Sequence, residues 1–204
     1  MIPPRLIRTV PTHTSEEAEA FWRTACDLHP GWGFMTFRDP IDPDDFPTTS
    51  PHWGRCQNGA QLAGLVRLEA LYLHGGIYLD SDVELYRPLD PLLSLSCFAA
   101  WEDPNTVPDA VVGATAGHPA ILACLTEAIR RLTEPDTGDW RTGSGAWSTG
   151  PGVFTALLPS RDDVTLLPRE SFYPYHYTER HRRHDDHRGP DTYGAHHWAG
   201  SWLA

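Results

Sequence analysis

The 204-residue chain contains no lysine, and all 16 of its basic residues are arginines. Because 27 residues are acidic, the formal net charge is −11. A general nucleic-acid-binding surface needs clustered basic side chains, so this composition argues against a nucleic-acid partner. The negative charge of any anionic ligand would have to be balanced by a few arginines, by backbone N–H groups or by a bound cation.

Long apolar runs and cysteine pairs are also missing. No apolar stretch approaches the roughly 18–20 residues of a membrane-spanning helix, and the first residues lack the charged leader and apolar core of a secretory signal. Cys26, Cys56, Cys97 and Cys124 form no C-x-x-C pair. This spacing predicts reduced, mostly buried thiols rather than a zinc ribbon or a disulfide scaffold. We therefore expect a cytoplasmic protein with no transmembrane segment.

The chain alternates between strand and helix patterns. The clearest are strands at Arg5–Val10 and Gly33–Phe37 and helices at Ser15–His29 and Asn58–Gly76, with Ser15 as a cap and Gly75 or Gly76 as a stop. Further predicted elements are short strands at 77–79, 83–86, 96–101, 109–115 and 164–168, a helix at Pro119–Leu132, a short helix within 149–159, and loops at 39–55 and 174–192. This order predicts one α/β domain over residues 1–204, built around a mostly parallel sheet.

Two aspartates follow an apolar strand in the run HGGIYLDSDVEL, from His74 to Leu85. Residues i and i+2 of a strand project to the same side, so the carboxylates of Asp80 and Asp82 should meet where open α/β sheets bind ligands. Two charges about 5 Å apart repel by roughly 3 kcal/mol at an effective dielectric constant near 20. The pair therefore indicates a compensating cation or a protonated acid; a solvated polar turn is the structural alternative.

The longer run LVRLEALYLHGGIYLDSDVELYRPLD, from Leu65 to Asp90, resembles the signature of glycosyltransferase family 32 and its relatives. These are DXD-motif sugar transferases of the capsular polysaccharide and initiating mannosyltransferase types. IPPRLIRTVP near the start, TGPGVFT at 149–155 and AHHWAGSW at 195–202 are similar to further segments of the family. The resemblance implies a GT-A fold with a Rossmann-like nucleotide-binding sheet. It also implies metal-dependent transfer of a hexose, with retained configuration, from a UDP- or GDP-sugar to a glycan, natural product or protein acceptor.

The resemblance implies roles for individual residues as well. Asp80 and Asp82 would form the catalytic pair and ligate Mn²⁺ or Mg²⁺, with His196 as the favoured third protein ligand and His197 as its alternative. Oxygen donors with one imidazole suit manganese, and the cation would neutralise a diphosphate in this acidic chain. The residues implied to bind the donor are Arg67, Gly76, Tyr78, Asp80, Ser201 and Trp202.

One position departs from the family pattern. The family usually has an aspartate three residues before the arginine, where it binds sugar hydroxyls, but this chain has Gly64. Either another acid supplies the contact, from the 39–45 loop or as Glu102 or Asp103, or the sugar preference differs, or the activity is low. Two other functions stay open. IYLDSDVEL also fits the nucleophile motif of haloacid-dehalogenase-like phosphatases, and Gly64 is compatible with a non-catalytic binder of nucleotide sugars.

Overall fold

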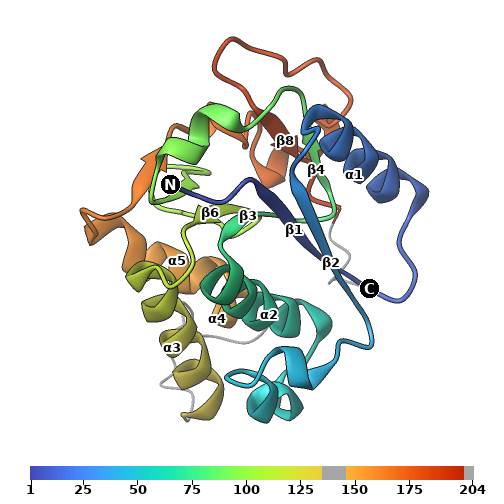
Figure 1. Ribbon diagram of the computed structural model, residues 1–204. Helices are drawn as coiled ribbons and strands as arrows, with labels where there is room; N and C mark the ends of the chain where they lie inside the picture. Colours follow the sequence, from blue (N-terminus) through green and yellow to red (C-terminus); the bar gives the residue numbers. More distant parts are fainter. Residues whose placement is uncertain (135–145, 200–204) are drawn as a thin grey trace.

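A six-stranded sheet forms the centre of the computed structural model, which describes residues 1–134 and 146–199 (Figure 1). The strand order is β2-β1-β3-β6-β5-β7. β1 is parallel to β2 and β3, and β5 is parallel to β7, whereas β6 is antiparallel to both of its neighbours. The mostly parallel α/β sheet is thus confirmed. Its strands are β1 (Arg5–Val10), β2 (Gly33–Arg38), β3 (Gly76–Leu79), β5 (Cys97–Ala100), β6 (Val111–Ala114) and β7 (Thr165–Leu167).

Different elements cover the two faces of the sheet (Figure 1). One face packs against α2 (Gly59–His74), α3 (Pro119–Thr133), α4 (Ala146–Thr149) and α5 (Pro151–Leu157). The other face meets α1 (Glu16–Leu28) and a two-stranded sheet of β4 (Val83–Leu85) and β8 (Gly194–His196). Successive residues of a strand face opposite sides of the sheet, so each strand contributes to the apolar cores on both faces. Ile7 and Tyr78 belong to the core under α2–α5, and Leu6 and Ile77 belong to the core on the other face.

The ends of the two long predicted helices follow local chemistry. The Ser15 hydroxyl accepts a hydrogen bond from the Ala18 N–H at 3.2 Å, and three glutamates occupy the first turn of α1. Helix α2 stops at Gly75, whose φ of +60° lies in the left-handed region. A Cβ there would meet the Ala116 nitrogen at 2.6 Å, so only glycine fits. Both predicted boundaries are confirmed.

The two segments predicted as loops contain short 3-10 helices. Within 39–55 the buried Glu69 side chain of α2 accepts hydrogen bonds from the backbone N–H groups of Thr48 and Thr49, both at 2.8 Å. Because this carboxylate is remote in sequence, local patterns could not reveal the ordering that it imposes. The 3-10 helices of the described chain span Pro43–Asp45, Ser50–Arg55, Asp90–Ser94, Leu158–Ser160, Arg169–Ser171 and Tyr177–Arg182.

All four cysteines are free, as predicted. Cys97 and Cys124 are buried, whereas Cys26 and Cys56 are half-buried. Among the described residues, no helix has both the length and the apolar character needed to cross a membrane.

Candidate functional site

Acidic residues gather at one edge of the central sheet. β3 and β5 run in the same direction because each is antiparallel to β6, so their carboxyl ends share an edge. Asp80 directly follows β3, and its N–H donates to the Ala110 carbonyl at 2.8 Å. Asp109 lies two residues before β6, which begins at that edge. Ligands of open α/β sheets bind at this position.

Arg67 of α2 holds two of these acids. Its side chain is buried, and one terminal nitrogen lies 2.6 Å from Asp80 Oδ1. The other terminal nitrogen donates to the Asp109 backbone carbonyl at 2.7 Å and forms an ion pair with the Asp109 carboxylate. The Tyr78 hydroxyl lies 3.1 Å from the same Asp80 oxygen, while its ring lies beneath the guanidinium group. Arg67 therefore positions Asp80; its contact with a donor stays a prediction.

Asp82 meets His196 through the small sheet. Strands β4 and β8 pair Val83 with His196, which brings the histidine beside the acidic pair. His196 Nε2 lies 3.1 Å from Asp82 Oδ1, and the Ala199 N–H donates to Asp82 Oδ2 at 2.7 Å. One ligand atom from each of Asp80, Asp82 and His196 lies within 4.8 Å of the others. Two carboxylates and an imidazole at this spacing suit a divalent cation.

The surroundings shift the pKa values of the two aspartates in opposite directions. Burial raises the pKa of Asp80 to about 6 against the opposing charge of Arg67, and neighbouring acids add to this rise. Burial acts in the same direction on Asp82, but the charge and hydrogen bond of His196 outweigh it and hold its pKa below the ordinary value. In turn, although burial disfavours the imidazolium form, Asp82 raises the pKa of His196. Arg67 and His196 therefore relieve the repulsion between Asp80 and Asp82 that the sequence predicts.

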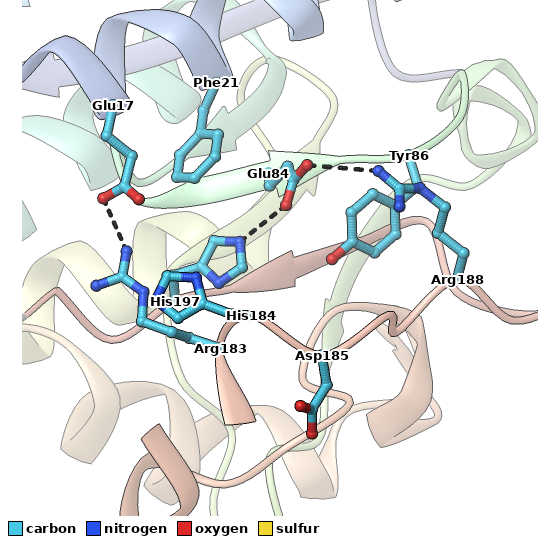
Figure 2. Close-up of a pocket in the computed structure, with 9 residues that line it drawn as sticks. All are labelled: Glu17, Phe21, Glu84, Tyr86, Arg183, His184, Asp185, Arg188 and His197. Atoms are coloured by element: carbon cyan, nitrogen blue, oxygen red, sulfur yellow. Dashed lines mark hydrogen bonds and ion pairs between the residues drawn. The ribbon is translucent and has the colours of Figure 1, made fainter. Parts of the chain in front are cut away.

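His197 faces away from this pair. Its Nδ1 lies 2.8 Å from the Tyr175 hydroxyl and its Nε2 lies 3.0 Å from Glu84 Oε2, so both ring nitrogens are engaged. The ring lines a pocket of about 240 Å³ between α1 and the 183–188 segment, and Figure 2 shows it among the other lining side chains. None of the described residues that line this pocket is Asp80, Asp82 or His196. Of the two predicted histidines, the structure thus brings only His196 to the acids.

Gly64 is enclosed by a neighbouring helix. A Cβ on this residue would lie 2.8 Å from Thr149 Oγ1 and 2.9 Å from the Thr149 carbonyl oxygen. Thr149 itself is buried, and its hydroxyl donates to the Gln61 carbonyl at 3.1 Å. The close approach of α2 and α4 leaves no room for the aspartate that the resemblance would place here. The departure from the family pattern is therefore built into the packing.

Substituting Gly64 should expose this constraint. We expect Gly64→Ala to lower the free energy of unfolding by about 1–3 kcal/mol, because the added methyl group overpacks the α2–α4 contact. The matched change Gly59→Ala lies in the first turn of the same helix, where a Cβ meets nothing within 4 Å, and should have little effect. Urea unfolding of both variants measures the difference. Equal stability of the two variants would contradict the steric account.

Two other residues predicted to bind the donor, Gly76 and Tyr78, are closely packed against neighbouring parts of the protein. Gly76 has a φ of +123°, and a Cβ there would lie 2.8 Å from the Arg5 carbonyl oxygen. Tyr78 is fully buried, with its hydroxyl 2.6 Å from Thr9 Oγ1. Ser201 and Trp202 lie outside the described residues. Contacts of these four with a donor stay predictions.

Sequence reasoning missed Asp109 and Tyr173. Asp109 precedes the apolar run of β6, which was a usable signal for an acid at a sheet edge. Tyr173 is fully buried, and this burial, together with the charges of Asp109, Asp80 and Glu102, raises its pKa well above the ordinary value. Its sequence surroundings carry no comparable signal.

Comparison with known proteins identifies related chains. Residues 15–99 match the model of the glycosyltransferase sugar-binding region containing a DXD motif. Inositol phosphoceramide mannosyltransferase 3 of Schizosaccharomyces pombe is 27% identical over 196 residues, covering 87% of this chain and 54% of the relative. Mannosyl phosphorylinositol ceramide synthase SUR1 of Saccharomyces cerevisiae is 28% identical, covering 81% of this chain and 46% of the relative. The chain thus spans about half the length of these relatives.

Solved structures share the fold. The ligand-free glycosyltransferase domain of the YGT toxin has a TM-score of 0.63 at 7% identity, covering 81% of this chain and 80% of that one. The PaToxG glycosyltransferase has a TM-score of 0.55 at 15% identity, covering 77% and 68%. These likenesses confirm the GT-A fold. Residues 15–99 are thus similar to the glycosyltransferase sugar-binding region containing a DXD motif, and the chain shares the fold of these solved glycosyltransferases.

Proposed function

We propose that this chain is a metal-dependent glycosyltransferase domain that moves a sugar from a nucleoside-diphosphate sugar to an acceptor. The observation that carries the proposal is the convergence of Asp80, directly after β3, Asp82, directly before β4, and His196, on β8, at the edge where open α/β sheets bind ligands. The family match covers the first two of these residues. The mannosyltransferase relatives support the same class of reaction.

Each residue of the site has a distinct part in this proposal. Asp82 and His196 would bind the cation directly, and Asp80 would complete the set of protein ligands. Arg67 fixes the orientation of Asp80 from α2, and the Ala199 N–H fixes that of Asp82. When bound, the cation supplies charge neutralisation for the diphosphate and for the leaving group. Mn²⁺ is the first choice because it accepts an imidazole ligand, with Mg²⁺ as the alternative.

The relatives also guide the choice of donor. Their names describe mannosyl transfer, so we propose a mannosyl donor as the first candidate, with GDP-mannose tested beside other UDP- and GDP-sugars. We further propose retention of the anomeric configuration, on the strength of the family resemblance. The configuration of the first product, determined by NMR, checks this part separately.

A thermal-shift screen tests the proposal. A ligand that binds only the folded chain stabilises it by about 2.7 kcal/mol at a hundredfold excess over Kd, which corresponds to a rise in Tm of about 5–10 °C for a chain of this size. We expect one nucleotide sugar to produce this rise with Mn²⁺ and not with EDTA. The same mixture should release the nucleoside diphosphate.

Different outcomes would favour the other functions. Hydrolysis of a chromogenic phosphate ester with Mg²⁺, without any nucleotide-dependent change in Tm, would indicate a phosphatase. A cation-dependent rise in Tm without release of nucleoside diphosphate, under all acceptors offered, would indicate a binder. Either result contradicts the proposed transferase.

A further inference from the structure

A group of aromatic rings lies beside the candidate cation site and reaches the surface. The ring centroid of Trp198 lies 4.1 Å from that of His196, and the buried Tyr173 ring lies 5.9 Å from both. Tyr177 meets Trp198 edge-on, with the centroids 6.2 Å apart. Tyr177 is 51% exposed and Trp198 is half-buried. The rings therefore lead from a proposed cation ligand to solvent.

Tyr177 is exposed but held in a fixed place. It begins a 3-10 helix that His176 and Glu179 close with a capping box, and the His176 ring packs 4.4 Å from the Tyr177 ring. Burial raises the pKa of Glu102, and the charge of His176 and a backbone hydrogen bond from Tyr177 oppose this rise. The tyrosine is thus attached to the end of β5. A ligand that stacked on its ring would immobilise little that is not already ordered.

Trp198 has a strained backbone. Its φ of +53° is the positive φ of a residue other than glycine in the described part of the chain. Bulky side chains rarely adopt this region, and such strain is concentrated at sites that contact ligands. The indole N–H donates to the Tyr175 carbonyl at 3.4 Å, which holds the ring against His196. The strain and this contact indicate that the position of the indole ring matters to the site.

The position of Tyr177 separates it from the expected place of the nucleotide. β2, β1 and β3 are parallel neighbours, and nucleotides lie across the carboxyl ends of such strands. Tyr177 is attached at Glu102, which follows β5 on the far side of β6. The nucleotide and Tyr177 therefore fall on opposite sides of the cation site. The acceptor of the proposed transfer must approach the sugar from a side that the nucleotide leaves open.

The chemistry of this surface fits a carbohydrate ring. Beside the exposed tyrosine, His176 Nε2 lies 3.6 Å from Asp103 Oδ2, and these side chains are 25% and 28% exposed. A pyranose ring combines an apolar C–H face, which packs on the electron-rich face of an aromatic ring, with hydroxyl groups around its edge. Polar groups beside an aromatic surface would orient those hydroxyls. An acyl chain has no hydroxyl groups for this polar border.

We propose that Tyr177 and Trp198 form an aromatic platform on which a sugar ring of the acceptor stacks, so that the acceptor is a glycan or glycoside. The inference rests on the proposed function and deepens it, because it names the class of acceptor. Tyr177 would bind the acceptor and would not touch the nucleotide. It is also the residue to substitute, since a change at Trp198 would disturb His196.

Acceptor kinetics test the platform. The donor is the nucleotide sugar that raises Tm most, the acceptors are the methyl glycosides of mannose, glucose and galactose, and the readout is Mn²⁺-dependent release of nucleoside diphosphate. We expect at least one glycoside to accelerate release by the wild type. Tyr177→Ala should raise the KM for that glycoside about threefold to tenfold, as for the loss of one aromatic contact. The Kd of the donor, measured by calorimetry without acceptor, should stay the same.

Two further variants complete the test. Tyr177→Phe keeps the ring and should retain a KM within about twofold of the wild type. Phe34→Ala is the matched control, because Phe34 is a 43% exposed aromatic residue near the start of β2, at the opposite end of the parallel strands. It should leave the KM for the glycoside unchanged. Equal KM values for Tyr177→Ala and Phe34→Ala would overturn the inference.

Other outcomes would overturn it in different ways. Weaker donor binding by Tyr177→Ala would assign the ring to the nucleotide. A wild type that binds the donor but is accelerated by none of the glycosides, whether or not a serine-containing peptide accelerates it, would exclude a carbohydrate acceptor. A wild type that binds no nucleotide sugar at all would contradict the proposed function itself, so the two failures are distinguishable.

Discussion

Replacing Asp82 with asparagine should reduce Mn²⁺-stimulated release of nucleoside diphosphate by about a hundredfold to a thousandfold or more. The amide keeps the size of the side chain and can still accept from the Ala199 N–H, but it removes the negative charge that pairs with His196 and would bind the cation. Changes to groups that merely support metal ligands already cost about 10–100-fold. The measurement is the initial rate of nucleotide release at saturating Mn²⁺.

An exposed aspartate provides the matched control. Asp162→Asn makes the same chemical change at the start of the β7 segment, away from the site, and should keep wild-type turnover. The Tm of both variants must show that they are folded. Full turnover by a folded Asp82→Asn protein would remove Asp82 from the cation site.

Replacing Arg67 with methionine should produce the largest loss of stability. The methionine side chain keeps part of the apolar contact with Tyr78 but leaves Asp80 and Asp109 without their shared cation. Breaking a buried ion pair from one side costs about 3–5 kcal/mol, which corresponds to a fall in Tm of about 6–20 °C for a chain of this length. Equilibrium unfolding in urea gives the difference directly.

Arg130→Met is the control for this change, because Arg130 is exposed on α3 and pairs with glutamates on the surface. Its Tm should match that of the wild type within measurement error. If Arg67→Met were as stable as Arg130→Met, the acids at the sheet edge would not depend on Arg67 for their neutralisation.

The elements that local chemistry specifies could be predicted from the sequence. Ser15 and Gly75 mark helix ends through a side-chain cap and a left-handed backbone, and both act within one turn of the helix. The alternation of strands and helices likewise predicted the class of sheet. The antiparallel direction of β6 could not be predicted, because strand direction depends on pairing with β3 and β5 across long sequence separations.

In the candidate site, too, the features set by local sequence could be predicted and those set by long-range pairing could not. Asp80 and Asp82 are only two residues apart in the chain, so their proximity could be predicted. The structure places them in the turn between β3 and β4, where the Val83 N–H donates to the Asp80 carbonyl, and not within a strand as the sequence pattern predicted. The choice between His196 and His197 depends on the register between β4 and β8, which the sequence does not reveal. The ion pair of Asp109 with Arg67 joins the segment just before β6 to α2, which is remote in sequence, so no local pattern could predict it.

The pairing of β4 with β8 also bears on how the molecule holds together. Asp82 and His196 belong to parts of the chain that are far apart in sequence, and the last described strand meets the body of the protein through this small sheet. An ion shared by the two residues would therefore act as a cross-link that closes a very long loop. Removal of the ion by a chelator would therefore weaken the β4–β8 contact first. The segment that contains β8 would lose order at a lower temperature or denaturant concentration than the central sheet.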